Sequence, residues 1–442
     1  MSSTERQMHF GLLMTANGSH FGGWRLPQAD PATSFTLKHY VDLALEAERG
    51  LFDLVFMADT LALIPNQLPA TLGHAPPIAH LEPLTLLSAL AGLTRHIGLA
   101  GSATTTYYHP YLVARLFASL DHISNGRAGW NLITSGNPAE AYNFGFDRHP
   151  DHADRYDRAR EFADVVFGLW DSWTDEAFVF DKARGLYFDP LGMRAPNHVG
   201  KHFKVRGPLN MARPPQGRPV MAQAGSSEPG RALAAATADI VFTAQQNLAG
   251  ARAFYADLKA RTSAAGRAAG SVAVLPGVAP VVGATEAEAR RKFDALQEAF
   301  DPLIGLDALS AEFGIDLSVY PLDAPLPDDL PASPRATSRR DLMLEQMRRE
   351  GLTLRQLGAQ TASLGHWVLC GTPTSIADTL EEWFHGGAAD GFIIMPGALP
   401  SGLTDFVDQV VPELQRRGLF RKRYTSTTLR GHLGLAHPAI RA

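Results

Sequence analysis

The sequence contains very little cysteine: Cys370 is the single one among 442 residues. One cysteine can neither close a disulfide within the chain nor build a Cys-cluster metal site or an iron–sulfur site. The disulfide-stapled secreted domain is therefore excluded, and we expect a reducing, cytoplasmic location. Positive charge is not in excess either, since 40 Lys and Arg stand against 45 Asp and Glu, a formal net charge of −5. This balance argues against a nucleic-acid partner, because phosphate contacts need a basic surface.

Long apolar runs are also absent, and no stretch approaches the roughly 18 apolar residues of a membrane-spanning helix. The two most apolar segments, residues 271–282 and 364–370, are short and contain glycine or polar residues, which is typical of buried strands. The N-terminal sequence MSSTERQMHFGLLM has no apolar core before a cleavage site. We therefore expect neither a secretory segment nor a membrane partner.

Strand-like and helix-like segments alternate along most of the chain. The strands lack a polar alternation, as expected when both faces of a parallel sheet are buried. About eight strand–helix units favour an α/β fold of one domain over residues 1–442, a closed (β/α)8 TIM barrel. The expected strands cover residues 8–14, 51–58, 97–103, 128–134, 219–224, 240–244, 272–282 and 391–395. The expected helices cover residues 36–49, 83–93, 110–123, 155–173, 229–238, 285–300 and 374–384.

Two segments interrupt this alternation. Residues 174–218 are rich in aromatic residues, glycine and proline, and we expect an insertion, such as a hairpin, between the fourth and fifth strands. Residues 301–364 include the acidic, proline-rich piece LDAPLPDDLPASP and the basic helical piece RRDLMLEQMRRE. We interpret them as a second insertion near the barrel mouth. A disordered linker is the alternative, because proline and charge are its usual composition.

Polar residues at the carboxyl ends of the strands are the first place to look for chemistry in such a barrel. Here they are mostly neutral, and they lack the paired carboxylates of a glycosidase and the lysine of a Schiff-base enzyme. They predict a hydrogen-bonding surface for a polar cofactor. The set comprises Asp59, Thr104, Thr105, Thr106, Asn131, Thr134, Ser135, Gln223, Thr243, Gln245, Gln246 and Asn247.

The turn at residues 225–230 is the most distinctive of these strand ends. Gly225, Ser226 and Ser227 precede a helix start, where free backbone N–H groups and hydroxyls suit a phosphate. A serine N-cap followed by Pro229 in the first helical turn gives the same pattern. Both interpretations are open on these residues alone.

Histidines occur singly and do not predict a metal site. His149 and His152 lack the third ligand of an H-E-x-x-H arrangement, so we expect no metal. His152 and Tyr156 are four residues apart and share a helix face, although by themselves they are typical of an exposed helix start. His20 lies in the glycine-rich loop ANGSHFGGWRLP, as a candidate acid–base or substrate contact or as a plain surface histidine. No G-x-G-x-x-G opens a helix after a strand, so a built-in nicotinamide-binding unit is not supported.

Several longer strings carry a specific resemblance. They are HFGGWRLP, FMAD, RLFASLDHISNGRAGWNLITS, NFG, H-x-x-R-Y-x-x-A-x-E-F, GKHFKVRGPLNMARPPQGRPVMAQAGSSEPG and the tail YTSTTLRGHLGL. Over residues 8–435 the chain resembles the flavin-dependent monooxygenases of the nitrilotriacetate monooxygenase and dibenzothiophene-sulfone monooxygenase group, within the bacterial-luciferase-like superfamily.

This resemblance implies a (β/α)8 barrel that binds reduced FMN (FMNH2), supplied by a separate NAD(P)H:flavin oxidoreductase. In the family, FMNH2 and O2 give a C4a-(hydro)peroxyflavin, which inserts one oxygen atom into a small organic substrate. The protein keeps this intermediate shielded from water. The superfamily also implies a homodimer or homotetramer.

Position by position, the resemblance assigns cofactor contacts to seven residues. Asp59, Thr105 and Asn131 resemble the contacts of the isoalloxazine ring. His152, Tyr156, Ser227 and the adjacent Ser226 resemble the contacts of the ribityl phosphate.

The resemblance also implies catalytic roles for His20 and Ser135, near the reacting oxygen and the substrate. Its pocket positions correspond to Phe56, Phe242 and Val368, for which core packing is the simplest interpretation of the residues alone. The first loop differs from the family, because GSHFGGWR carries Ser19 where paired histidines are common.

Other functions are compatible with parts of the pattern. An F420-dependent oxidoreductase of the same superfamily would transfer hydride without O2, but the GKxFKVRGPLN block and the tail argue against it. A cofactor-free barrel hydrolase would need carboxylates or metal ligands that the strand ends lack. Related enzymes oxidise sulfones, sulfides, aminopolycarboxylates, alkanes and antibiotic precursors. The neutral strand ends favour an uncharged or sulfur-containing substrate over an aminopolycarboxylate, which would need several Arg or Lys groups.

Overall fold

A closed barrel of eight parallel strands forms the centre of the computed structural model, which describes residues 6–63, 71, 73–74, 79–327, 329–331 and 338–441. The barrel closes because the first strand pairs with both the second and the last, and the predicted (β/α)8 architecture is confirmed. Its strands are β1 (His9–Leu13), β2 (Leu54–Met57), β3 (Gly98–Thr104), β4 (Ala128–Ile133), β7 (Val220–Gln223), β8 (Ile240–Thr243), β9 (Ala273–Val282) and β11 (Gly391–Ile394).

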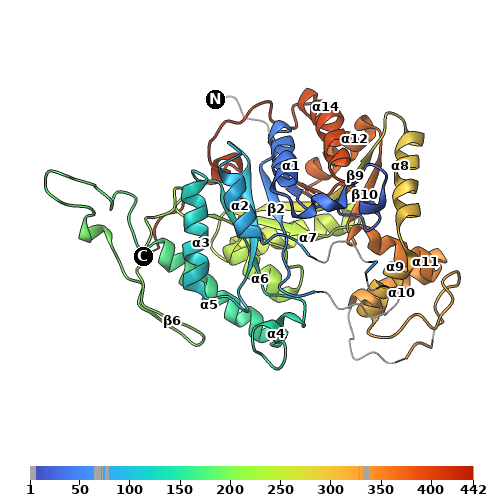
Figure 1. The fold of residues 1–442 in the computed structure, drawn as a ribbon, viewed down its shortest axis with the longest axis horizontal. Coiled ribbons are helices and arrows are strands. Elements are labelled where there is room, and N and C mark those ends of the chain that lie inside the picture. The colour runs from blue at the N-terminus through green and yellow to red at the C-terminus, as the bar shows by residue number, and fades with distance from the viewer. Residues whose placement is uncertain are drawn as a thin grey trace.

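Helices surround the barrel (Figure 1). The predicted helix over residues 110–123 is confirmed as α3, with Pro110 at its first position, where the missing N–H costs nothing. α5 begins at His152 and not at residue 155, because Asp151 is the last residue with extended backbone before it. The barrel helices are α1 (Leu37–Arg49), α2 (Pro83–Ala91), α3 (Pro110–Ile123), α5 (His152–Trp170), α6 (Glu228–Thr237), α7 (Leu248–Ala264), α8 (Glu286–Ala299) and α12 (Pro373–His385). The C-terminal helices are α13 (Ser401–Asp405), η7 (Phe406–Val410), α14 (Val411–Arg416) and α15 (Leu429–His432).

A ninth parallel strand, β10 (Trp367–Gly371), lies beside the barrel. It pairs with the C-terminal half of β9, from Val278 to Val282, while β11 pairs with β9 at Gly277 and Val278. The apolar run over residues 364–370 is thus a strand, as predicted, but it lengthens one side of the barrel mouth without joining the ring of eight.

The C-terminal segment fills the amino-terminal end of the barrel. Leu429 of α15 belongs to the buried cluster inside the barrel. A Cβ at Gly98 would lie 2.5 Å from a methyl group of Leu429, and one at Gly129 would lie 3.4 Å from the other. The two glycines on neighbouring strands therefore leave the space that this leucine occupies.

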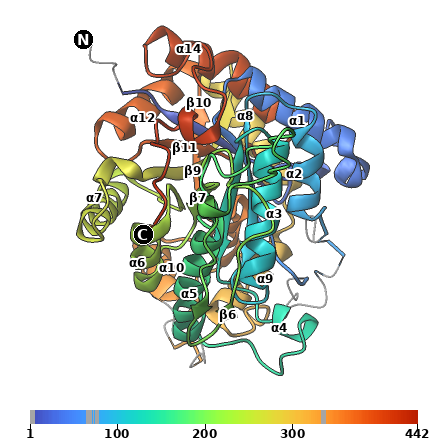
Figure 2. The same ribbon diagram turned by 90° about the vertical axis from the view of Figure 1, so that its left-hand side faces the viewer.

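Two segments leave the barrel (Figures 1 and 2). Residues 174–218 form an arm that contains the antiparallel hairpin of β5 (His198–Val199) and β6 (Lys204–Val205). The described residues between 301 and 363 form a helical layer of α9 (Pro302–Phe313), α10 (Ser338–Glu350) and α11 (Leu354–Gln360). These helices share a buried cluster that includes Phe313, Met347 and Leu357, so the described part is not a linker. Residues 328 and 332–334 of the proline-rich piece, and residues 335–337 after it, lie outside the described residues.

Candidate active site

At the carboxyl end of the barrel, polar side chains satisfy one another only in part. Asn131 on β4 donates from Nδ2 to Oγ of Ser102 on β3 at 2.8 Å, and Ser102 donates to the carbonyl oxygen of Met57 at 2.9 Å. Because Ser102 has one proton and uses it on Met57, the amide of Asn131 must present Nδ2 to it. Oδ1 of Asn131 is then buried with no hydrogen-bond partner among the described residues, and so is Oε1 of Gln223 at the end of β7. An unsatisfied buried acceptor costs about 1–3 kcal/mol, so both atoms indicate a ligand with N–H groups.

The imidazole of His20 offers the complementary group. Its Nδ1 accepts a hydrogen bond from the backbone N–H of Gly22 at 3.0 Å, so the neutral ring carries its proton on Nε2. Nε2 is buried and has no hydrogen-bond partner in the described part of the chain. Burial lowers the pKa of His20 from 6.5 to about 4. His20 is therefore an uncharged donor at neutral pH, packed edge-on against the ring of Phe300.

Ser135, predicted as catalytic, follows β4 in a strained conformation. Its φ of 51° is left-handed, which costs a residue other than glycine roughly 1–2 kcal/mol. Its Oγ lies 2.5 Å from Oε2 of Glu140 and 2.8 Å from Oγ1 of Thr104. Arg155 holds the turn by donating to the carbonyl oxygens of Thr134 and Ser135.

The sequence pattern did not single out Glu140. It stands at the start of α4 (Glu140–Asn143), in a stretch that resembles an exposed helical turn. Its side chain is nevertheless 2% exposed, and its Oε1 lies 3.1 Å from Oγ1 of Thr60. Glu140 is recognisable as a candidate site residue only because its carboxyl group is buried, and this burial cannot be seen in the sequence.

Four predicted phosphate contacts converge at the start of α6. The ring centroids of His152 and Tyr156 are 4.8 Å apart, and the hydroxyl of Tyr156 lies 3.5 Å from Oγ of Ser227. Ser227 caps α6 by accepting from the backbone N–H of Gly230, and Ser226 beside it is exposed. A Cβ at Gly225 would lie 3.3 Å from the Tyr156 hydroxyl, so the missing side chain keeps this cradle open. The serine thus serves as an N-cap and lines the cradle as well.

Asp59 and Thr105 also lie at the mouth, and each makes a side-chain hydrogen bond within the protein. Oδ1 of Asp59 lies 2.7 Å from Nε2 of His80, and this hydrogen bond raises the pKa of His80. Oγ1 of Thr105 donates to the carbonyl oxygen of Ile133 at 3.2 Å. Each residue therefore already uses one side-chain oxygen within the protein.

The predicted apolar pocket residues separate into two places. Phe56 and Phe242 pack edge to face inside the barrel, with ring centroids 5.5 Å apart. His366, which the sequence did not single out, stacks on Phe242 at 5.0 Å. Val368 packs instead with a cluster that includes Val281 and Leu296. The structure brings together the first two predicted residues, and the third lies on the neighbouring strand β10.

Comparisons with known proteins agree with this architecture. Residues 12–390 match the family model of luciferase-like monooxygenases. The chain belongs to this family. It is 51% identical to nitrilotriacetate monooxygenase component A of Aminobacter aminovorans over 441 residues, 98% of this chain and 97% of that protein. The EDTA monooxygenase of Chelativorans sp. BNC1 superposes with a TM-score of 0.85 at 36% identity, over 99% of this chain and 100% of that one. A riboflavin lyase solved with modified FMN and riboflavin has a TM-score of 0.86 at 30% identity, over 98% and 97% of the two chains.

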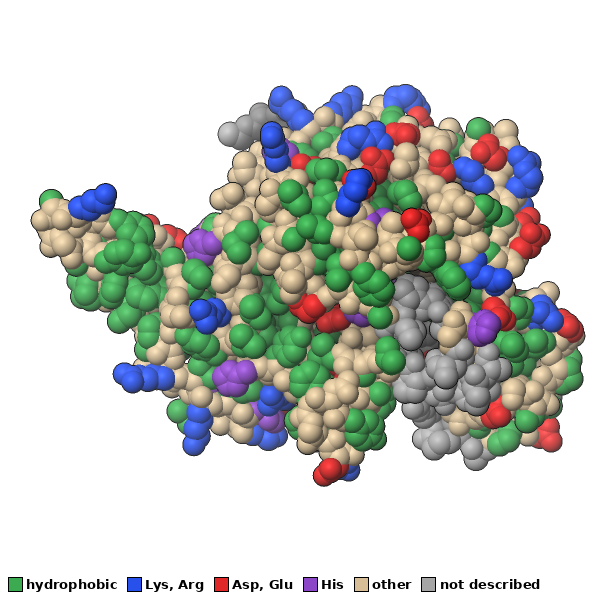
Figure 3. All heavy atoms as spheres, viewed as in Figure 1, with side chains coloured by type: hydrophobic (Ala, Val, Ile, Leu, Met, Phe, Trp, Pro, Cys, Tyr) green, Lys and Arg blue, Asp and Glu red, His purple; other side chains and the backbone are tan. Residues whose placement is uncertain are grey.

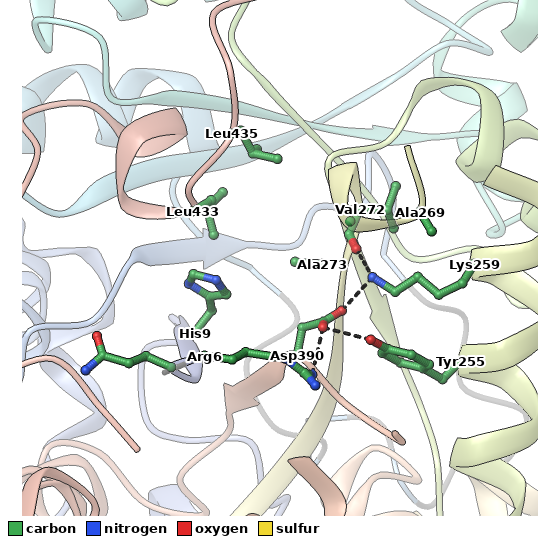
Figure 4. Close-up of a pocket in the computed structure, with 12 residues that line it drawn as sticks. Arg6, His9, Tyr255, Lys259, Ala269, Val272, Ala273, Asp390, Leu433 and Leu435 are labelled. Carbon is green, nitrogen blue, oxygen red and sulfur yellow. Dashed lines mark hydrogen bonds and ion pairs between the residues drawn. The ribbon is translucent and has the colours of Figure 1, made fainter. Parts of the chain in front are cut away.

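This luciferase-like monooxygenase also has a cavity away from the mouth. A space of about 500 Å³ opens at the amino-terminal ends of β1 and β9 (Figure 4). Its charged groups satisfy one another, since Asp390 accepts from Arg6 and Tyr255 and pairs with Lys259 at 2.9 Å. This network ties the strand starts together, and we assign it to stability.

Two further features of this monooxygenase concern metals and membranes. In the described ranges, no three His, Cys, Asp or Glu side chains are grouped so that they could hold a metal ion. Over the same ranges, no helix has the length and apolar character needed to cross a bilayer.

Proposed function

We propose that the chain is the oxygenase of a two-component system, which uses FMNH2 and O2 to insert one oxygen atom into a small organic substrate. One observation carries the proposal: a phosphate cradle and a set of unpartnered neutral groups lie at the same end of the barrel. The riboflavin lyase described above supports a flavin, because it was solved with modified FMN and spans nearly the whole chain.

FMN fits the groups present. A phosphate would take the first turn of α6, with the hydroxyls of Tyr156 and Ser227 and the backbone N–H groups that a helix start leaves free. The N–H groups of the isoalloxazine ring match the buried acceptors of Asn131 and Gln223. When bound, FMNH2 supplies the electrons that activate O2 for oxygen transfer.

The protein's own groups then have separate tasks. His20 would donate from Nε2 to the reacting oxygen without giving up a full proton, because the site keeps its imidazole neutral. The rings of Phe56 and Phe242 would form the apolar floor of the substrate pocket and exclude water. Val368 would add a further apolar side chain to the substrate pocket from β10.

Aminopolycarboxylates are the first substrate class to test. The relatives described above are named for nitrilotriacetate and EDTA, both of this class. The neutral strand ends favour the opposite choice, an uncharged or sulfur-containing substrate. A panel with nitrilotriacetate and a dialkyl sulfone separates the two classes.

The reduced cofactor would come from a separate NAD(P)H:flavin oxidoreductase. The word "component A" in the name of the relative at 51% identity supports a second component. The sequence carries no G-x-G-x-x-G unit of its own for a nicotinamide.

A second copy of the chain would cover the arm and α3, giving a homodimer or homotetramer. Leu112, Leu116 and Ile123 form an exposed apolar stripe at helical spacing on α3, and the arm adds exposed Phe180 and Leu191. Apolar side chains gather on the projecting arm (Figure 3). The base of the arm runs along α3, where the Tyr111 hydroxyl donates to Asn210, so the two surfaces are continuous. A stripe of this kind can pair with its own copy about a two-fold axis.

Anaerobic titration with photoreduced FMN tests the proposed function. We expect saturable binding of FMNH2, and oxygen from 18O2 in the product once O2 and a substrate of the right class are added. Binding of reduced F420 in place of FMNH2 would overturn the proposal and move the chain to hydride transfer.

A further inference from the structure

Glu140 is buried at the barrel mouth, where its hydrogen-bond partners are hydroxyls and the nearby Arg155 forms no direct ion pair with it. Its side chain is only 2% exposed. Burying a carboxylate that no cation pairs directly is costly, and this cost points to a role for the group at the mouth. Two of its contacts are the hydroxyls of Thr60 and Ser135.

The contact to Ser135 fixes the direction of one proton. A hydroxyl has a single proton, and a carboxylate oxygen can only accept. At 2.5 Å from Oε2 of Glu140, the proton of Ser135 therefore points at the carboxylate. Thr104, 2.8 Å away on the other side, must then supply the proton of the second hydrogen bond.

Ser135 is left with one lone pair and no proton to offer a ligand. The left-handed backbone of Ser135 and the two hydrogen bonds from Arg155 hold its hydroxyl in this place. Desolvation lowers the pKa of the Arg155 guanidinium, and the nearby carboxylate of Glu140 is one of the groups that oppose this shift, so the two charges partly offset each other. The cluster thus leaves the Ser135 hydroxyl able to accept a further hydrogen bond but not to donate one.

We propose that Glu140 is a positioning residue that makes Ser135 an obligate acceptor and thereby selects the reduced form of the flavin. The inference rests on the proposed function. Reduction converts N5 of the isoalloxazine ring from a lone-pair acceptor into an N–H donor, so an acceptor at Ser135 attracts the reduced ring and repels the oxidised one. The preference lets the oxygenase capture FMNH2 in the presence of oxidised FMN.

The test compares the dissociation constants of oxidised FMN and anaerobic FMNH2 in the full-length protein. In Glu140→Gln the amide can donate to Ser135, whose proton then becomes free to turn outward. We expect the ratio of the two constants to fall at least tenfold, which lowers the midpoint potential of bound FMN by about 30 mV. Ser135→Ala should lose the preference to the same extent, and the double variant should lose no more.

Glu82→Gln is the matched control, because Glu82 is a carboxylate that caps α2 outside the cluster and should leave the ratio unchanged. Thermal melting identifies a variant that fails to fold. If Glu140→Gln fails to fold, Thr60→Val replaces it, because it removes the hydroxyl that contacts Oε1 of Glu140. We then expect a partial loss of the preference for FMNH2 over oxidised FMN. An unchanged ratio in folded Glu140→Gln overturns the inference, and so does a loss that Ser135→Ala does not share. If the unaltered protein binds neither form of FMN, the proposed function fails instead, so the two failures are distinguishable.

Discussion

The backbone N–H of Gly22 donates to Nδ1 of His20 at 3.0 Å, and this contact leaves the imidazole with a buried N–H and no basic nitrogen. A solvent-exposed histidine would titrate near neutral pH and could act as a base. In this loop His20 can donate a hydrogen bond but cannot act as a base. The catalytic role that the resemblance assigns to it is therefore that of a hydrogen-bond donor.

Because the folded protein lowers the pKa of His20, we expect the free energy of unfolding to decrease as the pH is lowered. Below pH 6.5 the unfolded chain takes up a proton at this residue, while the folded chain does so only near pH 4. Between pH 7.5 and pH 5 the free energy of unfolding should therefore drop by about 2 kcal/mol through this residue. Urea denaturation at both pH values measures it, and His20→Gln should remove most of that drop. His385→Gln, at an exposed histidine, is the control, and an equal drop in all three proteins would contradict the prediction.

Tyr156→Phe removes one hydroxyl from the cradle at α6. We expect the dissociation constant of FMN to rise five- to tenfold, the equivalent of about 1 kcal/mol, because a hydrogen bond to a charged phosphate is lost. Fluorescence titration measures the change. Riboflavin lacks the phosphate and should bind both proteins equally, so the same loss with riboflavin would show that the hydroxyl acts elsewhere. Tyr111→Phe, whose hydroxyl contacts Asn210 at the surface, is the matched control.

Leu429→Ala opens a cavity at the amino-terminal end of the barrel. Gly98 and Gly129 have no side chains to fill that space, so we expect a loss of about 2–4 kcal/mol in the free energy of unfolding. Chemical denaturation measures it. Leu191→Ala, at a leucine that is 93% exposed, should change stability by less than about 0.5 kcal/mol. Equal stability of the two variants would argue that α15 is not part of the core.

Charges on the exposed stripe of α3 should separate the copies. Leu112→Glu combined with Leu116→Glu places like charges across the proposed two-fold contact, where each copy meets the same surface of the other. Light scattering after size-exclusion chromatography should show a smaller assembly at micromolar concentration, with an unchanged melting profile for the monomer. Leu45→Glu on α1 tests whether any exposed leucine has this effect, and an assembly that withstands the double change would exclude α3.

The barrel could be predicted because each strand and helix is marked by residues within or next to it. The apolar run that forms β9 and the proline at the start of α3 are examples. Where β10 would pair could not be predicted, because its apolar composition fits an interior strand equally well. Strand order depends on partners that are distant in the sequence.

The cofactor contacts could be predicted only through the family resemblance. The residues alone left the turn at Ser227 open between an N-cap and a phosphate site, and the pair His152 and Tyr156 typical of an exposed helix start, yet the structure brings all three together. Glu140 could not be found this way, because its meaning comes from burial against Ser135 and Thr60. His366 reaches the ring of Phe242 only because β10 extends the mouth beside β9.

The pairing of β1 with β11 has a consequence for biosynthesis. The first strand can pair with β2 early, but its other edge stays open until residue 391 has been made, and Leu429 comes later still. At the roughly 5–20 residues per second of translation, on the order of 20–80 s separate the two strands. Throughout that time the nascent chain carries an open sheet edge and an unfilled interior. The protein is therefore an expected client of chaperones that shield incomplete sheets at the ribosome.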